Sequence, residues 1–164
     1  MSSEKKVPIE KLQGGCCFAC GTANPIGLNL QFYQLGDAVC SDITLGKYHE
    51  GWQNMAHGGI ISTLLDEVMS WTIIYFKKVF FVTRKMEVKY VNPVLVGIPL
   101  TVKGILRDES APPRITVRAE IRDDKKGRLL VRSKGEFVVL SKERLSSVPD
   151  DLKEDMVSLF RRFA

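Results

Sequence analysis

One apolar stretch in the middle of the chain constrains the fold more than any other feature. Between Ile60 and Phe76, 11 residues are apolar and none is proline, which predicts one long helix from about Gly58 to Lys77. A helix that is apolar around most of its circumference is too apolar to lie on the surface of a domain. We therefore expect the rest of the chain to fold around this helix.

The segments on both sides of the helix have the alternating pattern of β-strands. Two strands are expected before it and four after it, at about 28–34, 38–45, 82–91, 98–108, 114–123 and 128–140. The connections between the later strands carry the proline and glycine that turns require. The order predicts an α+β domain, in which a meander of antiparallel strands contributes to a curved sheet around one central helix.

Length and composition predict a single globular domain. The chain has 164 residues, of which 45% are hydrophobic and 26% are charged, and it contains no repetitive segment. We expect a flexible N-terminal segment at 1–13, the main domain at 14–142 and a helical tail at 143–164. One side of the tail helix is predicted to pack on the domain through Leu152, Met156, Phe160 and Phe163.

Several classes of protein are disfavoured. The N-terminus lacks the apolar core of a signal peptide, and no run of about 18 uncharged apolar residues is present to cross a membrane. We therefore expect a cytoplasmic protein with no membrane partner. The net charge of +5 is spread among acidic residues without a nucleic-acid-binding motif, so we expect no nucleic-acid partner, whereas an acidic small ligand stays open.

The cysteines raise the question of a metal. Cys17 and Cys20 have the spacing of half a zinc site or of a redox pair. Cys16 is adjacent, Cys40 is isolated in the sequence and the nearest histidine is His49, so a second pair of ligands is missing. We favour a reduced structural turn and expect neither a metal nor a cofactor.

Polar residues form one narrow stripe on the predicted helix. At about 100° per residue, Ser62, Thr63, Asp66 and Ser70 lie on the face that begins at Gly59. Glu67 falls at the margin of this stripe, so Asp66 is the better candidate for chemistry. The alternative is that Asp66 only accepts hydrogen bonds from neighbouring hydroxyl groups.

The start of the helix provides a second candidate feature. His57-Gly58-Gly59 places two peptides without side chains where backbone N–H groups are unpaired and the helix dipole favours negative charge. An oxygen that becomes anionic during a reaction would be stabilised there. A glycine-rich helix start is also common in simple turns, so this motif alone is weak.

In combination, three segments resemble a known family. "CFACGTANPIGLNL", "HEGWQNMAHGGIISTLLDE" and "TRKMEVKYVNPVLVGIPL" resemble, in order and spacing, the hotdog-fold acyl-coenzyme A thioesterases of the phenylacetate-pathway type. The resemblance covers about Cys17 to Leu140. It implies a hotdog fold, assembly into homodimers or homotetramers, and hydrolysis of an acyl-CoA thioester to free acid and CoA without a cofactor.

The resemblance also assigns candidate catalytic residues. Gly58 matches the backbone amide that binds the oxyanion, and Asp66 matches a helix carboxylate that acts as general base or as nucleophile. Thr83 matches a Thr or Ser that helps to place the water in some members of the family.

The loop before the helix departs from the family pattern. Several members have an asparagine six residues before the histidine, where this chain has Gly51, and Asn54 is the available substitute. His49 recurs in the family, and a site role and a loop-packing role are equally open. For His57 we favour a structural role in the turn.

We expect Gly59 and the basic residues of the next strand, Arg84, Lys85 and Lys89, to contact the coenzyme A part of the substrate. For any one of the three basic residues, a solvated strand face is the alternative. The main functional alternative is a non-catalytic hotdog protein that binds acyl-CoA or an acyl chain. A hotdog hydratase is disfavoured, because no hydratase-like pair of Asp and His is present.

Overall fold

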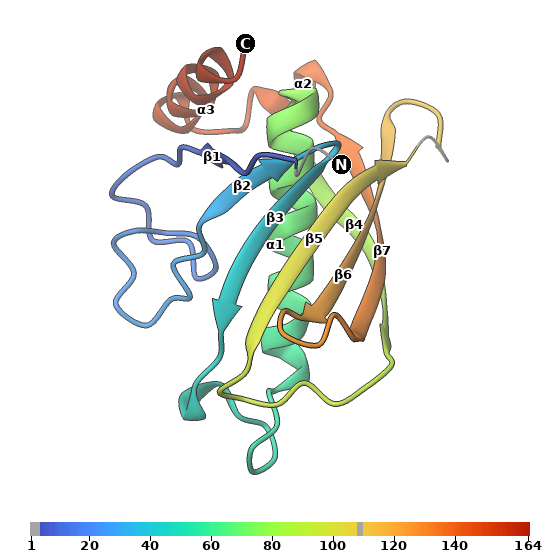
Figure 1. Cartoon of the computed structure of the whole chain (residues 1–164). Helices are drawn as coiled ribbons and strands as arrows, with labels where there is room; N and C mark the ends of the chain where they lie inside the picture. Colours follow the sequence, from blue (N-terminus) through green and yellow to red (C-terminus); the bar gives the residue numbers. More distant parts are fainter. Residues whose placement is uncertain (1–3, 108–109) are drawn as a thin grey trace.

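The computed structural model describes residues 4–107 and 110–164, and one long helix lies at its centre (Figure 1). This helix, α1 (Gly58–Lys77), has the predicted bounds. It ends at Lys78, which has the left-handed conformation (φ 53°) and donates its N–H to Ile73 O at 3.2 Å. Length and composition alone would let α1 span a membrane, but most of its apolar side chains are buried in the core of the domain.

Seven antiparallel strands form one sheet that curves around α1 (Figure 1). Along the chain they are β1 (Val7–Ile9), β2 (Phe32–Leu35), β3 (Ala38–Thr44), β4 (Phe81–Tyr90), β5 (Pro99–Arg107), β6 (Arg114–Asp123) and β7 (Leu129–Val139). Their order across the sheet is β1-β2-β3-β5-β6-β7-β4. The shorter helices are η1 (Lys47–His49), α2 (Lys142–Leu145) and α3 (Asp150–Arg162). The predicted hotdog architecture is therefore confirmed.

The structure corrects three details of the prediction. Residues 7–9, expected in a flexible segment, form β1 and pair with β2, because Ile9 buries its side chain in the core. The strand expected at 28–34 begins only at Phe32. The four strands after the helix are not one meander, since β4 pairs with β7 at the far edge and does not neighbour β5. The alternating pattern determines on which face of the sheet a side chain lies, but it does not determine which strands pair with each other.

The sheet approaches α1 closely where two strands carry glycine. A Cβ atom at Gly104 of β5 would lie 3.1 Å from Val68 O, and one at Gly135 of β7 would lie 2.9 Å from Met69 Sδ. Any larger residue would push the helix away from the sheet. The helix fills this space with fully buried side chains, namely Leu64, Leu65, Val68, Met69 and Ile73.

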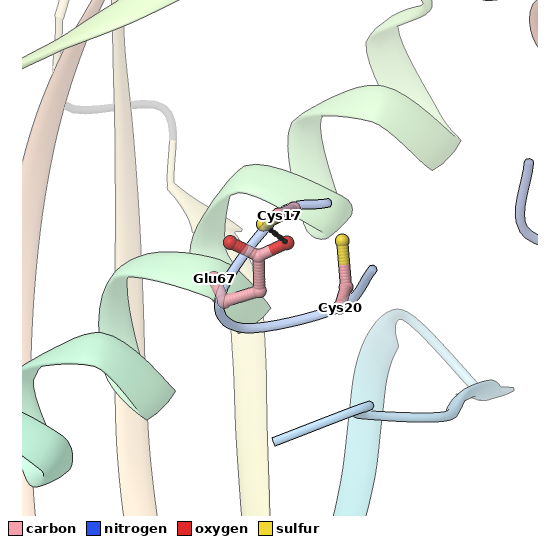
Figure 2. A group of neighbouring side chains, drawn as sticks. All are labelled: Cys17, Cys20 and Glu67. Atoms are coloured by element: carbon pink, nitrogen blue, oxygen red, sulfur yellow. Dashed lines mark hydrogen bonds between the residues drawn. The ribbon is translucent and has the colours of Figure 1, made fainter. Parts of the chain in front are cut away.

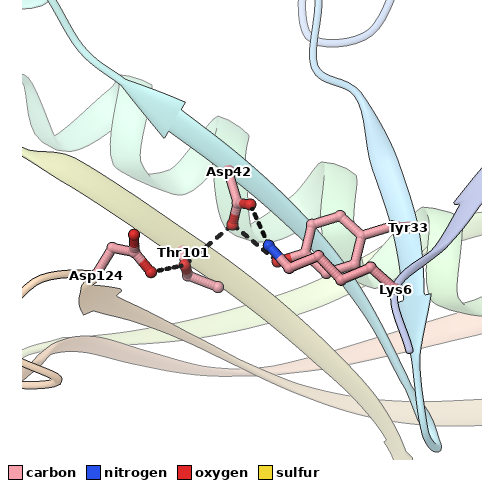
Figure 3. A network of polar contacts seen from close by, with 5 residues as sticks. All are labelled: Lys6, Tyr33, Asp42, Thr101 and Asp124. Atoms are coloured by element: carbon pink, nitrogen blue, oxygen red, sulfur yellow. Dashed lines mark hydrogen bonds and ion pairs between the residues drawn. The ribbon is translucent and has the colours of Figure 1, made fainter. Parts of the chain in front are cut away.

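A network of polar contacts links the N-terminal edge of the sheet to its neighbouring strands (Figure 3). Asp42 of β3 accepts hydrogen bonds from Lys6 Nζ and Tyr33 Oη, both at 2.8 Å. Thr101 Oγ1 of β5 lies 3.0 Å from Asp42 Oδ1 and 3.1 Å from Asp124 Oδ1. The network links the residue before β1 to three successive strands of the sheet.

The C-terminal helix α3 packs near the C-terminal end of α1 (Figure 1). Phe163 lies against Tyr75 and Phe160 against Phe80, with ring centroids 5.1 and 5.6 Å apart. The predicted stripe is wrong at Leu152, which is 47% exposed, whereas Leu159 is 1% exposed. The contacts of α3 follow the spacing 156, 159, 160 and 163, so its packed face is rotated from the predicted one.

This rotation predicts different effects for two leucines of the same helix. Leu159→Ala should lower the free energy of unfolding by about 2–5 kcal/mol, because it leaves a cavity between the tail and the core. Leu152→Ala, the matched control, should change it by less than about 0.5 kcal/mol. Urea unfolding of both variants measures the difference, and equal effects would contradict this packing of the tail.

Candidate active site

The start of α1 has one capped and one uncapped backbone N–H. His57 is the N-cap residue, and its Nδ1 accepts a hydrogen bond from Gly59 N at 2.9 Å. Within the described residues, the neighbouring Gly58 N–H has no hydrogen-bond acceptor. The first turn of the helix therefore presents a free donor at the positive end of the helix dipole.

Two histidines organise the loop that leads into the helix. His49 Nδ1 accepts a hydrogen bond from Gly46 N at 3.0 Å, and His49 O accepts one from His57 N at 2.8 Å. Both imidazole rings thus bond to the backbone of their own loop. This geometry is that of loop packing for His49 and of helix capping for His57.

Tyr90 at the end of β4 is a member of this region that the sequence did not single out. Its hydroxyl donates to Gly58 O at 3.0 Å and lies 3.3 Å from Ser62 Oγ. A Cβ atom at Gly58 would lie 3.2 Å from Tyr90 Oη, so the tyrosine approaches the helix start closely. The strand pattern places Tyr90 one residue before Val91-Asn92-Pro93, but nothing in that pattern signals a contact with the helix.

Asp66 lies partly buried on α1, on the side that faces β4. Its Oδ1 accepts a hydrogen bond from Thr83 Oγ1 at 3.0 Å, so the structure brings two of the predicted site residues together. Burial raises the pKa of the Asp66 carboxyl above its ordinary value, and the Thr83 hydrogen bond opposes this rise. A carboxyl with a raised pKa has the higher proton affinity that a general base uses.

The neighbouring Glu67 faces a different part of the protein. Its Oε1 accepts a hydrogen bond from Trp71 Nε1 at 3.1 Å and lies 3.9 Å from Cys17 Sγ. Successive helix residues point about 100° apart, which explains why the two carboxylates diverge. Asp66 and Glu67 therefore belong to separate sites.

Gly58 and Asp66 of one chain are too far apart to act on one atom. They lie eight residues apart on the same continuous helix, which is about 12 Å along the axis at 1.5 Å per residue. An oxyanion donor and a base must both lie within a few ångströms of the reacting carbonyl. One chain alone therefore does not assemble these two groups into one site.

The remaining predicted residues do not converge on Asp66. Asn54 has a left-handed backbone (φ 64°), and its backbone bonds to Glu50 Oε1 and to Val96 N hold the loop. Lys85 and Lys89 alternate along β4 with the partly buried Met86 and Val88, so they project from the face away from α1. Lys89 lines a groove of about 530 Å³ on that outer face. Arg84 is exposed at a bulge between Thr83 and Lys85.

The sequence pattern of the thioesterase superfamily matches residues 53–129, a range that contains Asn54, His57, α1 and β4. Over this range, a little under half of its length, the chain is similar to the thioesterase superfamily. A solved thioesterase superfamily protein superimposes with a TM-score of 0.70 at 27% identity, over 75% of this chain and 60% of that one. The predicted family is therefore confirmed at the level of a hotdog thioesterase.

Other relatives extend the comparison. Verlamelin biosynthesis protein B from Lecanicillium sp is 30% identical over 129 residues, 62% of this chain and 52% of that protein. The chain thus spans about half the length of this curated relative.

Two solved structures of lower identity show the shared fold. They are the E. coli PaaI protein from the phenylacetic acid degradation operon (TM-score 0.62, 14% identity, 70% and 81% of the two chains) and a hypothetical thioesterase from Streptococcus pneumoniae TIGR4 with coenzyme A (TM-score 0.61, 19% identity, 69% and 87%).

The contact between Thr83 and Asp66 gives a direct test of the site's electrostatics. Thr83→Val removes the hydrogen bond that lowers the pKa of Asp66, so this pKa should rise further. The Asp66 side chain should then become protonated at a higher pH as the solution is acidified. Thr83→Ser, the control, keeps the hydroxyl and should leave the pKa unchanged. A carbon-13 NMR titration of the Asp66 side chain measures it, and an identical curve for all three proteins would contradict the contact.

Proposed function

We propose that this protein hydrolyses an acyl-coenzyme A thioester to a free acid and coenzyme A. The observation that carries the proposal is the pairing of two features on one helix: the free Gly58 N–H at its start and the Thr83-held Asp66 carboxylate in its middle. A donor for a developing oxyanion and a base for water are the two groups that thioester hydrolysis requires.

The chemistry follows from these two groups. The Gly58 N–H binds the thioester oxygen as it becomes negative, and Asp66 removes a proton from the attacking water. The new C–O bond forms, the C–S bond breaks, and the proton passes to the leaving thiolate. The raised pKa of Asp66 suits this proton transfer, and Thr83 positions the carboxylate. An attack by the carboxylate itself would use the same residues.

Each active site is proposed to combine two subunits. Because Gly58 and Asp66 of one chain lie about 12 Å apart along α1, a two-fold partner must supply one of them. In such a homodimer, or a dimer of such dimers, Gly58 of one subunit acts with Asp66 of the other. Both sites of a dimer are then identical by symmetry.

The comparisons support a CoA thioester as the substrate class. The match to the thioesterase superfamily supports hydrolysis of acyl thioesters, and the streptococcal neighbour of the same fold was solved with coenzyme A. For the basic residues Arg84, Lys85 and Lys89 we retain a role toward the phosphates of CoA as part of the proposal. Because Lys85 and Lys89 point away from α1, they could contact CoA only if its phosphates lay on the outer face of the sheet. A cytoplasmic location is part of the same proposal.

The first test compares two adjacent carboxylates on a panel of acyl-CoAs of rising chain length, with released thiol as the readout. Asp66→Asn should lower turnover by about 10²-fold or more, the scale for loss of a general base, while its circular dichroism stays that of the wild type. Glu67→Gln, the matched control, should have little effect on turnover, because Glu67 faces the other site. If the two effects were reversed, the assignment of Asp66 would be wrong.

The same panel separates an enzyme from a binding protein. Saturable binding of acyl-CoA by the wild-type protein without any release of thiol would contradict hydrolysis and favour the non-catalytic alternative. Thiol release at a rate that rises with enzyme concentration supports the proposal.

The second test concerns the shared site and mixes two inactive variants. Asp66→Asn removes the base, and Gly58→Pro removes the N–H at a first-turn position where proline is tolerated. The backbone of His57 (φ −64°, ψ 135°) already has the conformation that a following proline favours. Gly58→Ala is the control that keeps the N–H, although its Cβ must displace Tyr90 Oη slightly.

Activity should return when the two variants exchange subunits. In each heterodimer, one site joins the intact Gly58 of the first chain to the intact Asp66 of the second, and the other site carries both lesions. We expect roughly half of the wild-type activity per heterodimer, or about a quarter after random reassortment. Subunit exchange without any return of activity would exclude the shared site.

A further inference from the structure

A second cluster of reactive side chains lies on the side of α1 away from Thr83. Cys17 and Cys20 come from one turn of the N-terminal loop and Glu67 comes from α1, and Figure 2 shows the three side chains converging. The two sulfur atoms and a carboxylate oxygen all lie within 4.8 Å of one another, and Cys17 Sγ is 3.9 Å from Glu67 Oε1. The proposed hydrolysis uses none of these atoms.

The turn that carries the two cysteines is rigidly built. Gly21 N donates to Cys17 O at 2.9 Å and closes the turn, and a Cβ atom at Gly21 would lie 2.6 Å from Cys17 N. Leu28 N and Leu30 N donate to the carbonyls of Phe18 and Ala19 at 2.8 and 3.0 Å. The backbone therefore fixes the turn before any side chain of the cluster contributes.

A buried cation lies beside the cluster. Lys11 is 6% exposed, and its Nζ donates to Cys20 O at 2.7 Å and to Leu30 O at 2.6 Å. A divalent cation with two thiolates and one carboxylate carries one net negative charge, which the Lys11 ammonium would neutralise.

We propose that Cys17, Cys20 and Glu67 bind one Zn²⁺ ion, with water as the fourth ligand. Two thiolates favour zinc over harder cations such as Mg²⁺ or Ca²⁺. With Zn–S of about 2.3 Å and Zn–O of about 2.0–2.2 Å, tetrahedral ligand atoms are about 3.5–3.8 Å apart, so small side-chain rotations complete the site. Zinc displaces one proton from each thiol, and both protons pass to solvent. The Trp71 N–H, 3.1 Å from Glu67 Oε1, orients the carboxylate.

The surroundings favour metal binding over a redox pair. The Glu67 carboxylate lies beside both sulfur atoms, and a bound cation can be shared by all three side chains, whereas a disulfide would involve only two of them. If Cys17 and Cys20 formed a disulfide, the Glu67 carboxylate would lie beside two neutral sulfur atoms and would have no metal ion to bind.

The ion would fasten the N-terminal loop to the central helix. Glu67 follows Asp66 directly in α1, so a clamp between residues 17–20 and Glu67 holds the helix segment that carries the proposed base. The role is structural, because the Asp66 carboxylate faces Thr83 and not the metal ligands.

The test titrates the full-length, reduced, metal-free protein with Co²⁺, whose thiolate complexes give a charge-transfer absorption band, and then displaces Co²⁺ with Zn²⁺. We expect one ion per chain. Cys17→Ser and Cys20→Ser should abolish the band, and Glu67→Gln should weaken the competition-derived Zn²⁺ affinity at least tenfold. Cys16→Ser is the matched control, because Cys16 lies in the same loop but outside the cluster. Circular dichroism checks that each variant folds.

A second readout is stability. Zn²⁺ should raise the melting temperature of the wild type and of Cys16→Ser but not that of Cys17→Ser, since only a protein with the site gains from binding. No thiolate band in the reduced wild type, or equal binding by the cysteine and control variants, would overturn the proposal. Formation of a Cys17–Cys20 disulfide by a protein that binds no Zn²⁺ when reduced would overturn it in favour of a redox pair.

Discussion

The close packing of α1 against the curved sheet is the constraint on which the other features depend. It is possible because β5 and β7 have glycine where the helix backbone and Met69 come nearest, at Gly104 and Gly135. Core packing at this density leaves the helix no freedom to rotate or slide without a cavity or a clash. The direction of every polar side chain on α1 is thereby fixed.

That fixed direction gives two adjacent carboxylates separate surroundings. Asp66 meets a hydroxyl group from β4, whereas Glu67 meets an indole N–H and two thiols. Burial raises the pKa of both, so each costs stability when it is ionised in the folded protein. The pKa of each carboxyl group is higher in the folded protein than in the unfolded chain. The free energy of unfolding therefore falls as the pH rises from the unfolded-state pKa through the folded-state pKa. A helix with only a structural role would avoid the cost with an apolar residue, which is why both positions point to chemistry or binding.

Much of the fold could be predicted from periodicity. The bounds of α1 and of β6 agree with the prediction, because a helical and an alternating pattern each follow from local geometry and burial. The predictions failed where pairing decides the outcome. Only its pairing with β2 makes Val7–Ile9 a strand, and only the tertiary structure places β4 beside β7. Three of the four residues predicted on the packed face of α3 lie there, but Leu159 takes the place of Leu152, because the contact with α1 sets the rotation of the helix.

The sequence by itself determined a long apolar helix inside an antiparallel sheet, a glycine-rich helix start and a polar stripe that contains Asp66. These follow from the spacing of residues along one element, and local sequence specifies such spacing. Only the tertiary structure decided that Thr83 bonds Asp66, that Tyr90 contacts Gly58, and that Cys17, Cys20 and Glu67 converge. Those contacts join residues 17 to 50 positions apart, and their distances depend on how the loop and β4 pack on α1, which no local pattern encodes.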